Sequence, residues 1–125
     1  MRGAVAVVAL ALTACGTRAS QPPQQAEPTV VWRPLGSWSG HGNRQTESFT
    51  SDTGTLRVTW EATGDFRLTA HSAISGRPLQ QVVEHPGGAG NGVGYVQQDP
   101  HVFYMVVEAP NVNWKFTVEE AIGYP

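Results

Sequence analysis

Hydrophobic and polar residues alternate over residues 55–61, where the pattern has a period of two. Leu56, Val58 and Trp60 fall on one side of an extended chain, and the residues between them are polar. Successive side chains of a strand point to opposite faces, so this segment predicts a strand with one buried and one solvent-facing side. Further strands are predicted over residues 36–43, 45–50, 66–71, 79–85, 93–97, 102–107 and 113–119.

The spacing of these segments predicts an all-β fold. Turn residues such as those at 63–65 and 75–78 separate the segments, and no stretch has a sustained helical period. Residues 102–107 are apolar at every position, which predicts a central strand covered on both faces. Seven to eight short strands predict an antiparallel β-sandwich, similar to a jelly roll, with a small β-barrel as the alternative.

The N-terminus has a different pattern. Residues 3–12 are an uncharged apolar run that follows Arg2. As a helix the run would measure about 15 Å, half of the ~30 Å hydrocarbon core of a bilayer, so it is too short to span a membrane. It has the length and composition of the apolar core of an export signal. We therefore expect residues 1–14 to be a signal peptide outside the folded domain.

The end of this run, Leu12-Thr13-Ala14-Cys15, resembles the lipobox of bacterial lipoproteins. The resemblance implies cleavage between Ala14 and Cys15, followed by lipid attachment to the Cys15 thiol. Two or three acyl chains would hold the protein firmly in a membrane leaflet, which predicts an exported protein anchored in a bacterial cell envelope. The alternative is an ordinary signal peptide that happens to have a cysteine near the cut.

The remaining chain divides into a tether and one domain. Residues 15–28 are rich in Pro and Gln and have no apolar side chain larger than alanine after Cys15, which predicts a disordered spacer. Residues 29–125 are long enough for a single domain. Because the chain has one cysteine, no intrachain disulfide can stabilise that domain. A net charge of −2, from 8 Lys and Arg against 10 Asp and Glu, argues against nucleic acid as a partner.

Four segments of the domain resemble a group of small exported bacterial domains that are often lipoproteins. They are residues 38–42, 58–60, 99–104 and 112–119. The group has no assigned activity, so the resemblance implies the β fold and supplies no catalytic residue.

Candidate metal and phosphate sites are weak in this sequence. Residues 85–94 are rich in glycine but contain no nucleotide-binding motif, which favours a flexible connection between strands. None of the four histidines has ligand spacing to another, and the turn aspartates do not form an EF-hand pattern. We therefore predict no metal and no cofactor. The residues considered are His41, His71, His85, His101, Asp52, Asp65 and Asp99.

Catalytic motifs are also lacking. Ser37, Ser39, Ser48 and Ser51 are not part of a G-x-S-x-G turn, and their spacing assigns no histidine or aspartate to them. The one pair of adjacent carboxylates, at 119–120, would point to opposite faces of a strand. The sequence thus predicts a protein without catalytic activity, and a small hydrolase is the weaker alternative.

The main open question is whether any aromatic side chain is exposed and contacts a ligand. Trp60 and Trp114 alternate with apolar neighbours and should lie in the core, to which all four tryptophans are expected to contribute. Trp32, Trp38 and Tyr124 are the candidate ligand contacts, against the alternative that such residues only close the ends of the sandwich. We expect a structural or interaction module whose partners are the membrane, through the lipid, and an envelope protein or glycan. A carbohydrate-binding module is the second hypothesis.

Overall fold

The computed structural model describes residues 30–122. The expected signal peptide, the cleavage site at Ala14 and Cys15, the tether and Tyr124 lie outside the described residues. Between residues 30 and 122 no helix is long and apolar enough to cross a membrane. In the same residues the strands are, in chain order, β2 (Val31–His41), β3 (Arg44–Gln45), β4 (Phe49–Ser51), β5 (Thr55–Ala62), β6 (Phe66–Ser72), β7 (Pro78–His85), β8 (Gly90–Gln97), β9 (His101–Glu108) and β10 (Asn113–Ile122).

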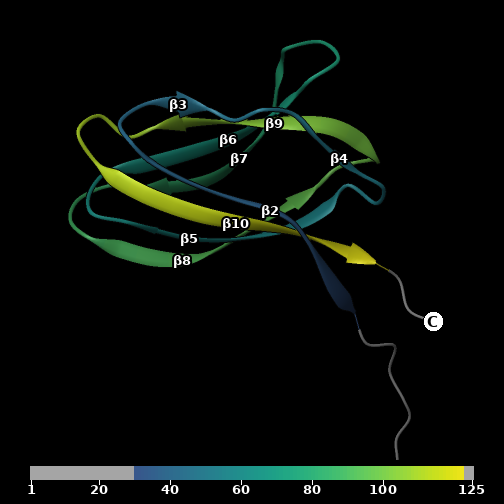
Figure 1. Ribbon diagram of the computed structural model, residues 1–125, viewed down its shortest axis with the longest axis horizontal. Helices are drawn as coiled ribbons and strands as arrows, with labels where there is room; N and C mark the ends of the chain where they lie inside the picture. The colour runs from purple at the N-terminus through teal and green to yellow at the C-terminus, as the bar shows by residue number, and fades with distance from the viewer. Residues whose placement is uncertain (1–29, 123–125) are drawn as a thin grey trace, which may run out of the picture. The chain divides into compact units, whose positions relative to one another are not determined.

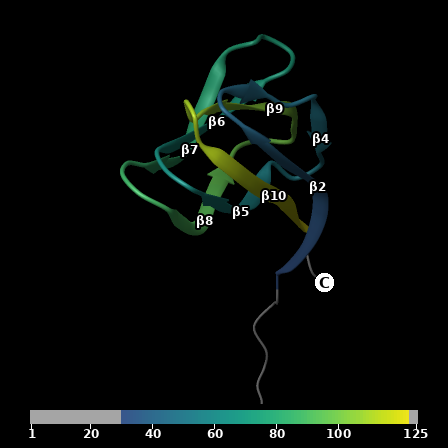
Figure 2. The same cartoon turned by 60° about the vertical axis from the view of Figure 1, so that its left-hand side comes forward.

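The strands form two antiparallel sheets packed face to face (Figures 1 and 2). One sheet has the order β2-β10-β5-β8, and the other has the order β3-β9-β6-β7, with β4 also paired to β9. The described strands do not close into a barrel, so the predicted β-sandwich is confirmed and the barrel alternative is wrong. The start of β2 lies beside the end of β10, where Val31 is the partner of Ile122.

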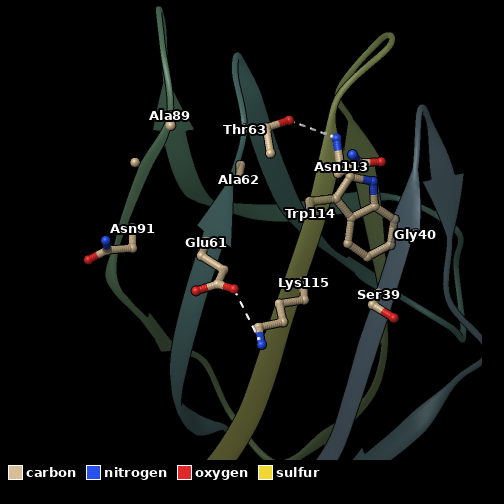
Figure 3. A pocket seen from close by; sticks show the side chains of 11 residues that line it. Ser39, Gly40, Glu61, Ala62, Thr63, Ala89, Asn91, Asn113, Trp114 and Lys115 are labelled. Atoms are coloured by element: carbon tan, nitrogen blue, oxygen red, sulfur yellow. Dashed lines mark hydrogen bonds and ion pairs between the residues drawn. The ribbon is translucent and has the colours of Figure 1, made fainter.

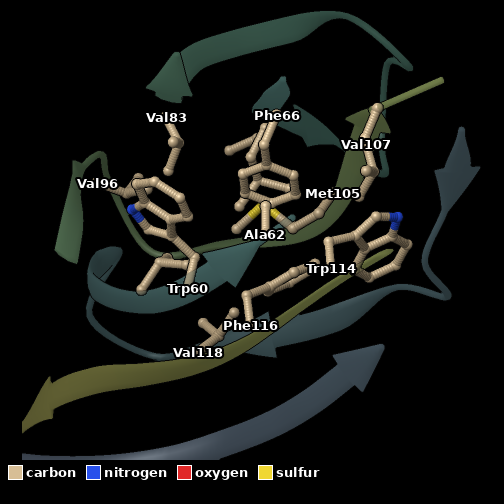
Figure 4. Close-up of a cluster of buried hydrophobic side chains, with 14 of the residues drawn as sticks. Trp60, Ala62, Phe66, Val83, Val96, Met105, Val107, Trp114, Phe116 and Val118 are labelled. Atoms are coloured by element: carbon tan, nitrogen blue, oxygen red, sulfur yellow. The ribbon is translucent and has the colours of Figure 1, made fainter. Parts of the chain in front are cut away.

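The core lies between the two sheets and is rich in aromatic rings (Figure 4). The side of β5 that the alternation predicted to be buried faces inward, and its Trp60 stacks on Phe66 with ring centroids 5.4 Å apart. Trp114 stacks on Phe116 of the same strand at 5.6 Å. Trp60 and Trp114 are 8% and 5% exposed, as predicted. Burying one large apolar side chain contributes about 1.5 to 3 kcal/mol, so these rings are a main source of stability.

Strand β8 corrects the expected flexible connection over residues 85–94, because β8 occupies the second half of that segment. Gly92 and Gly94 of β8 face the core, and because they have no side chain they leave room for Trp60 and for the backbone of Val82. A Cβ atom on Gly92 would lie 3.3 Å from the indole of Trp60, and one on Gly94 would lie 2.7 Å from the carbonyl oxygen of Val82. These glycines therefore serve close packing inside the sandwich rather than loop flexibility.

Strand β9 is central, as residues 102–107 predict, since it pairs with β6 on one edge and with β3 and β4 on the other. The expectation that both of its faces are covered is wrong in part. Phe103 and Met105 are fully buried against the other sheet, whereas Tyr104 and Val106 on the opposite face are only half-buried. On that face the His71 ring of β6 packs beside Tyr104, with ring centroids 5.1 Å apart.

Candidate functional site

The four-stranded sheet has a polar side that faces away from the core. Alternation along each strand places hydroxyl, amide and charged groups there, and strand pairing aligns them in rows. Lys115 is the partner of Ser39 on one side and of Glu61 on the other. We call this surface the outer face. It consists of Ser37, Ser39, Arg57, Thr59, Glu61, Asn91, Val93, Tyr95, Asn113, Lys115, Thr117 and Glu119.

Side chains of neighbouring strands interact along these rows. Lys115 Nζ lies 3.3 Å from Glu61 Oε2, which links β10 to β5 (Figure 3). Ser37 Oγ and Thr117 Oγ1 form a hydrogen bond of 2.9 Å between β2 and β10. The outer face is therefore a continuous set of hydrogen-bonding groups that spans strands far apart in the sequence.

Two adjoining hollows open on the outer face. The larger has a volume of about 680 Å³ and lies over the end of β5 and the start of β10, where Thr63 and Asn113 border it (Figure 3). The smaller has a volume of about 380 Å³ and lies over Thr59 and Thr117. Lys115 and Glu61 line both hollows, so the two form one depression with an ion pair at its middle.

An aromatic group lies on the same side of the sheet, toward the end at which β2 begins. The Trp32 side chain is half-buried, and its ring reaches from β2 across the sheet to Arg57 of β5 and Tyr95 of β8. The Arg57 guanidinium carbon is 4.5 Å from the Trp32 ring centroid, and the Tyr95 ring centroid is 6.3 Å from it. Glu119 holds Arg57 in place with an ion pair of 2.8 Å. Trp32 therefore packs outside the core, contrary to the expectation that all four tryptophans contribute to it.

The other aromatic candidates do not join Trp32. The Trp38 ring points inward, where it stacks on Phe116 at 5.4 Å and packs at a tilt against Phe49 at 5.5 Å. Its indole nitrogen donates a hydrogen bond of 3.0 Å to Glu47, and this bond is the main cause that lowers the pKa of the Glu47 carboxyl. Trp38 thus packs against the core, and Tyr124 lies beyond the described residues.

Tyr95 and Val93 are two outer-face residues that the sequence pattern did not single out as ligand contacts. Their side chains are 53% and 50% exposed. Both lie within the predicted strand 93–97, but the glycine-rich composition of residues 85–94 favoured a flexible connection, so their side chains were not assigned to an exposed face of a longer strand. The available signal was the recurrence of glycine at every second position, which marks the crowded inner side of a strand.

Ser72 and His101 are in contact, a pairing that the spacing of residues in the sequence did not indicate. Ser72 Oγ lies 2.6 Å from His101 Nε2. The same oxygen accepts hydrogen bonds of 3.1 Å from the backbone N–H groups of Ile74 and Ser75, so Ser72 stabilises the turn after β6. Ser72 is 3% exposed and lines neither hollow, so its hydroxyl does not reach a ligand bound in them.

The remaining histidines are held by separate contacts. His41 Nδ1 is 2.7 Å from Asn113 Oδ1, His71 Nδ1 is 3.4 Å from the carbonyl oxygen of Gly76, and His85 Nε2 is 2.7 Å from the carbonyl oxygen of Gly88. Nowhere between residues 30 and 122 do three His, Cys, Asp or Glu side chains group in a way that could hold a metal ion.

Glu119 and Glu120 point to opposite faces, as the strand geometry predicts. Glu119 is on the outer face, whereas the Glu120 side chain is 1% exposed. Glu120 accepts hydrogen bonds from Arg33 Nε at 3.0 Å and from Arg33 Nη2, and also from Ser51 Oγ at 2.8 Å and Asp52 N at 2.9 Å. Burial favours the neutral acid, but these bonds outweigh burial and hold the pKa of Glu120 below its usual range. The buried carboxylate of β10 therefore binds β2, the last residue of β4 and the residue that follows it.

No family model, curated protein or solved structure matches this chain. The lipobox and the resemblance to small exported bacterial domains therefore stay predictions from the sequence.

Proposed function

We propose that the protein is an exported, lipid-anchored module of a bacterial cell envelope that binds a ligand on its outer face and catalyses no reaction. The lipid on Cys15 would hold it at the membrane, and residues 15–28 would space the domain from the bilayer. The sequence pattern of the first fifteen residues supports the anchor.

The observation that carries the binding role is the depression on the outer face. Its larger part, at about 680 Å³, falls within the ~300 to 1,000 Å³ that ligand sites usually have. Lys115 and Glu61, which are 65% and 57% exposed, reach into it from two strands. Since an exposed ion pair contributes at most about 1 kcal/mol, both groups are available to a ligand at little cost in stability.

The chemistry of the outer face supports binding without catalysis. Its four Lys, Arg and Glu side chains are engaged in two ion pairs, Lys115 with Glu61 and Arg57 with Glu119. A nucleophile needs a general base within hydrogen-bond reach, and among the described residues the serine–histidine contact lies at a turn away from the depression.

The anchor is tested by metabolic labelling of the full-length protein with radioactive palmitate. The wild-type protein should be labelled and recovered with membranes, and Cys15→Ser should lose the label and keep its leader. Equal labelling of the two proteins would refute the lipid anchor.

The binding role is tested by capture from envelope extracts with tagged full-length protein. Thr59→Arg places a long charged side chain in the floor of the depression and should abolish capture. Thr50→Arg is the matched control, because Thr50 is an exposed strand threonine on the outward side of the other sheet. Capture that survives Thr59→Arg, or that Thr50→Arg abolishes equally, would refute the assignment to the outer face.

A further inference from the structure

The charges of the outer face cancel within the face itself. Lys115 pairs with Glu61 at 3.3 Å, and Arg57 pairs with Glu119 at 2.8 Å. Polyanions and polycations bind surfaces that carry a net charge of the opposite sign. The outer face has two cations against two carboxylates, so its electrostatics favour an uncharged ligand.

The polar groups of the outer face both donate and accept hydrogen bonds. Hydroxyls on Ser39 and Thr59 and the amide of Asn91 surround the Lys115–Glu61 pair. A carboxylate beside an ammonium group offers an acceptor and a donor a few ångströms apart. Neighbouring hydroxyl groups of a sugar need this combination, because each hydroxyl is both a donor and an acceptor.

An apolar surface adjoins these polar groups on β8. Val93 lies beside Thr59 in the paired strands, and Tyr95 follows it on the same face. About half of each side chain is exposed, at 50% for Val93 and 53% for Tyr95. A sugar ring has a face of C–H groups that packs on an aromatic ring while its hydroxyls point sideways.

We infer that the ligand of the outer face is an uncharged glycan, with its hydroxyl groups on Lys115, Glu61 and Asn91 and one sugar ring against Tyr95. The inference rests on the proposed function and specifies its ligand. Asn91 and Tyr95 are four residues apart on β8, a distance of about 13 Å along the strand. This span exceeds one sugar ring, so the ligand is an oligosaccharide or a polymer that lies along β8 and β5.

The test measures binding of the full-length protein to defined glycans by calorimetry, in a detergent without a sugar head group. The neutral probes are oligomers and polymers of β-1,4-glucose, β-1,3-glucose and α-mannose, and the anionic probes are heparin and alginate. At least one neutral probe should bind, with an affinity that rises from monomer to tetramer. Neither anionic probe should bind more tightly at low salt.

Variants locate the site. Tyr95→Ala should lower the affinity about tenfold, equivalent to about 1.4 kcal/mol, and Tyr95→Phe should retain it because the ring remains. Lys115→Ala should weaken binding as well. Arg67→Ala is the matched control, since Arg67 is a half-exposed cation that bridges Glu84 and Glu108 on the other sheet. Unfolding curves for each variant show whether the fold is retained.

The outcomes separate the inference from the proposed function. If a neutral glycan binds equally well to wild type, Tyr95→Ala and Lys115→Ala, the glycan site on the outer face is overturned. It is also overturned if only the anionic probes bind. If no glycan binds but outer-face variants abolish capture of protease-sensitive envelope material, the ligand is a protein, so the inference fails and the proposed function stands. If neither glycan nor envelope material binds, both fail.

Discussion

Replacing Glu120 with glutamine tests how much the buried carboxylate stabilises the sandwich. The carboxylate accepts two hydrogen bonds on each oxygen, from Arg33 on one and from Ser51 and Asp52 N on the other. Glutamine has one accepting oxygen and one donating NH₂ group, so in either orientation two of the four donors face another donor.

The magnitude follows from what each orientation loses. With the amide oxygen toward Ser51, the lost bonds are those of Arg33, whose side chain is 48% exposed and regains contact with water. The decrease in the free energy of unfolding then lies between ~1 kcal/mol, for the loss of a neutral hydrogen bond, and ~3 to 5 kcal/mol, for a buried charge left without its partner. We expect Glu120→Gln to lower the free energy of unfolding by about 2 kcal/mol, which lowers Tm by about 8 to 16 °C.

The assay is urea unfolding of the full-length protein, followed by tryptophan fluorescence. Glu119→Gln is the matched control, because it makes the same substitution one residue away, on the outer face. Its partner Arg57 and Glu119 itself are partly exposed, so the loss should stay under about 1 kcal/mol. A loss under about 0.5 kcal/mol for Glu120→Gln, or an equal loss for both variants, would refute the reasoning.

The pH dependence gives an independent check on Glu120. Its pKa is lowered in the folded protein, whereas an unfolded glutamate titrates near its usual value of about 4.3. The carboxylate therefore stabilises the fold fully above about pH 5, and this contribution is lost as the pH falls through the folded pKa. The stability difference between wild type and Glu120→Gln should be constant near neutral pH and shrink below about pH 4. A difference that grows in acid would contradict the assigned direction.

Two glycine substitutions, with Gly88→Ala as a control, test the packing of β8 and of the turn at Gly54. Gly94→Ala should cost about 1 to 3 kcal/mol in urea unfolding, because its Cβ would lie 2.7 Å from the backbone oxygen of Val82. Gly88→Ala, whose Cβ would meet nothing within 4 Å, should change stability by less than about 0.5 kcal/mol, and an equal effect of both would reject the packing argument. Gly54→Ala should cost about 2 kcal/mol or more, since Gly54 has a φ of 75° and its Cβ would lie 2.2 Å from the Gln98 carbonyl oxygen. Thermal unfolding that is unchanged in Gly54→Ala would show that the turn adjusts freely.

The local pattern of residues determined the strands and their faces. Over residues 55–61 and 113–119 each residue's side follows from its position alone, because the period of two is a property of a single extended chain. The all-β class, the burial of Trp60 and Trp114 and the opposite directions of the two adjacent glutamates were therefore predictable.

The tertiary structure decided which strands are neighbours, and with them the candidate site. Lys115, Glu61 and Ser39 share a row because β10 lies between β2 and β5, an arrangement that no local pattern specifies. Trp32 lies over the outer face because the register of β2 against β10 shifts between Val118 and Glu119, which reverses the alternation along the first part of β2. The glycines of β8 were taken for a loop because their role depends on the Trp60 ring opposite them. Pairing and packing join residues far apart in the chain, so they depend on the free energy of the whole fold, whereas alternation depends only on adjacent residues.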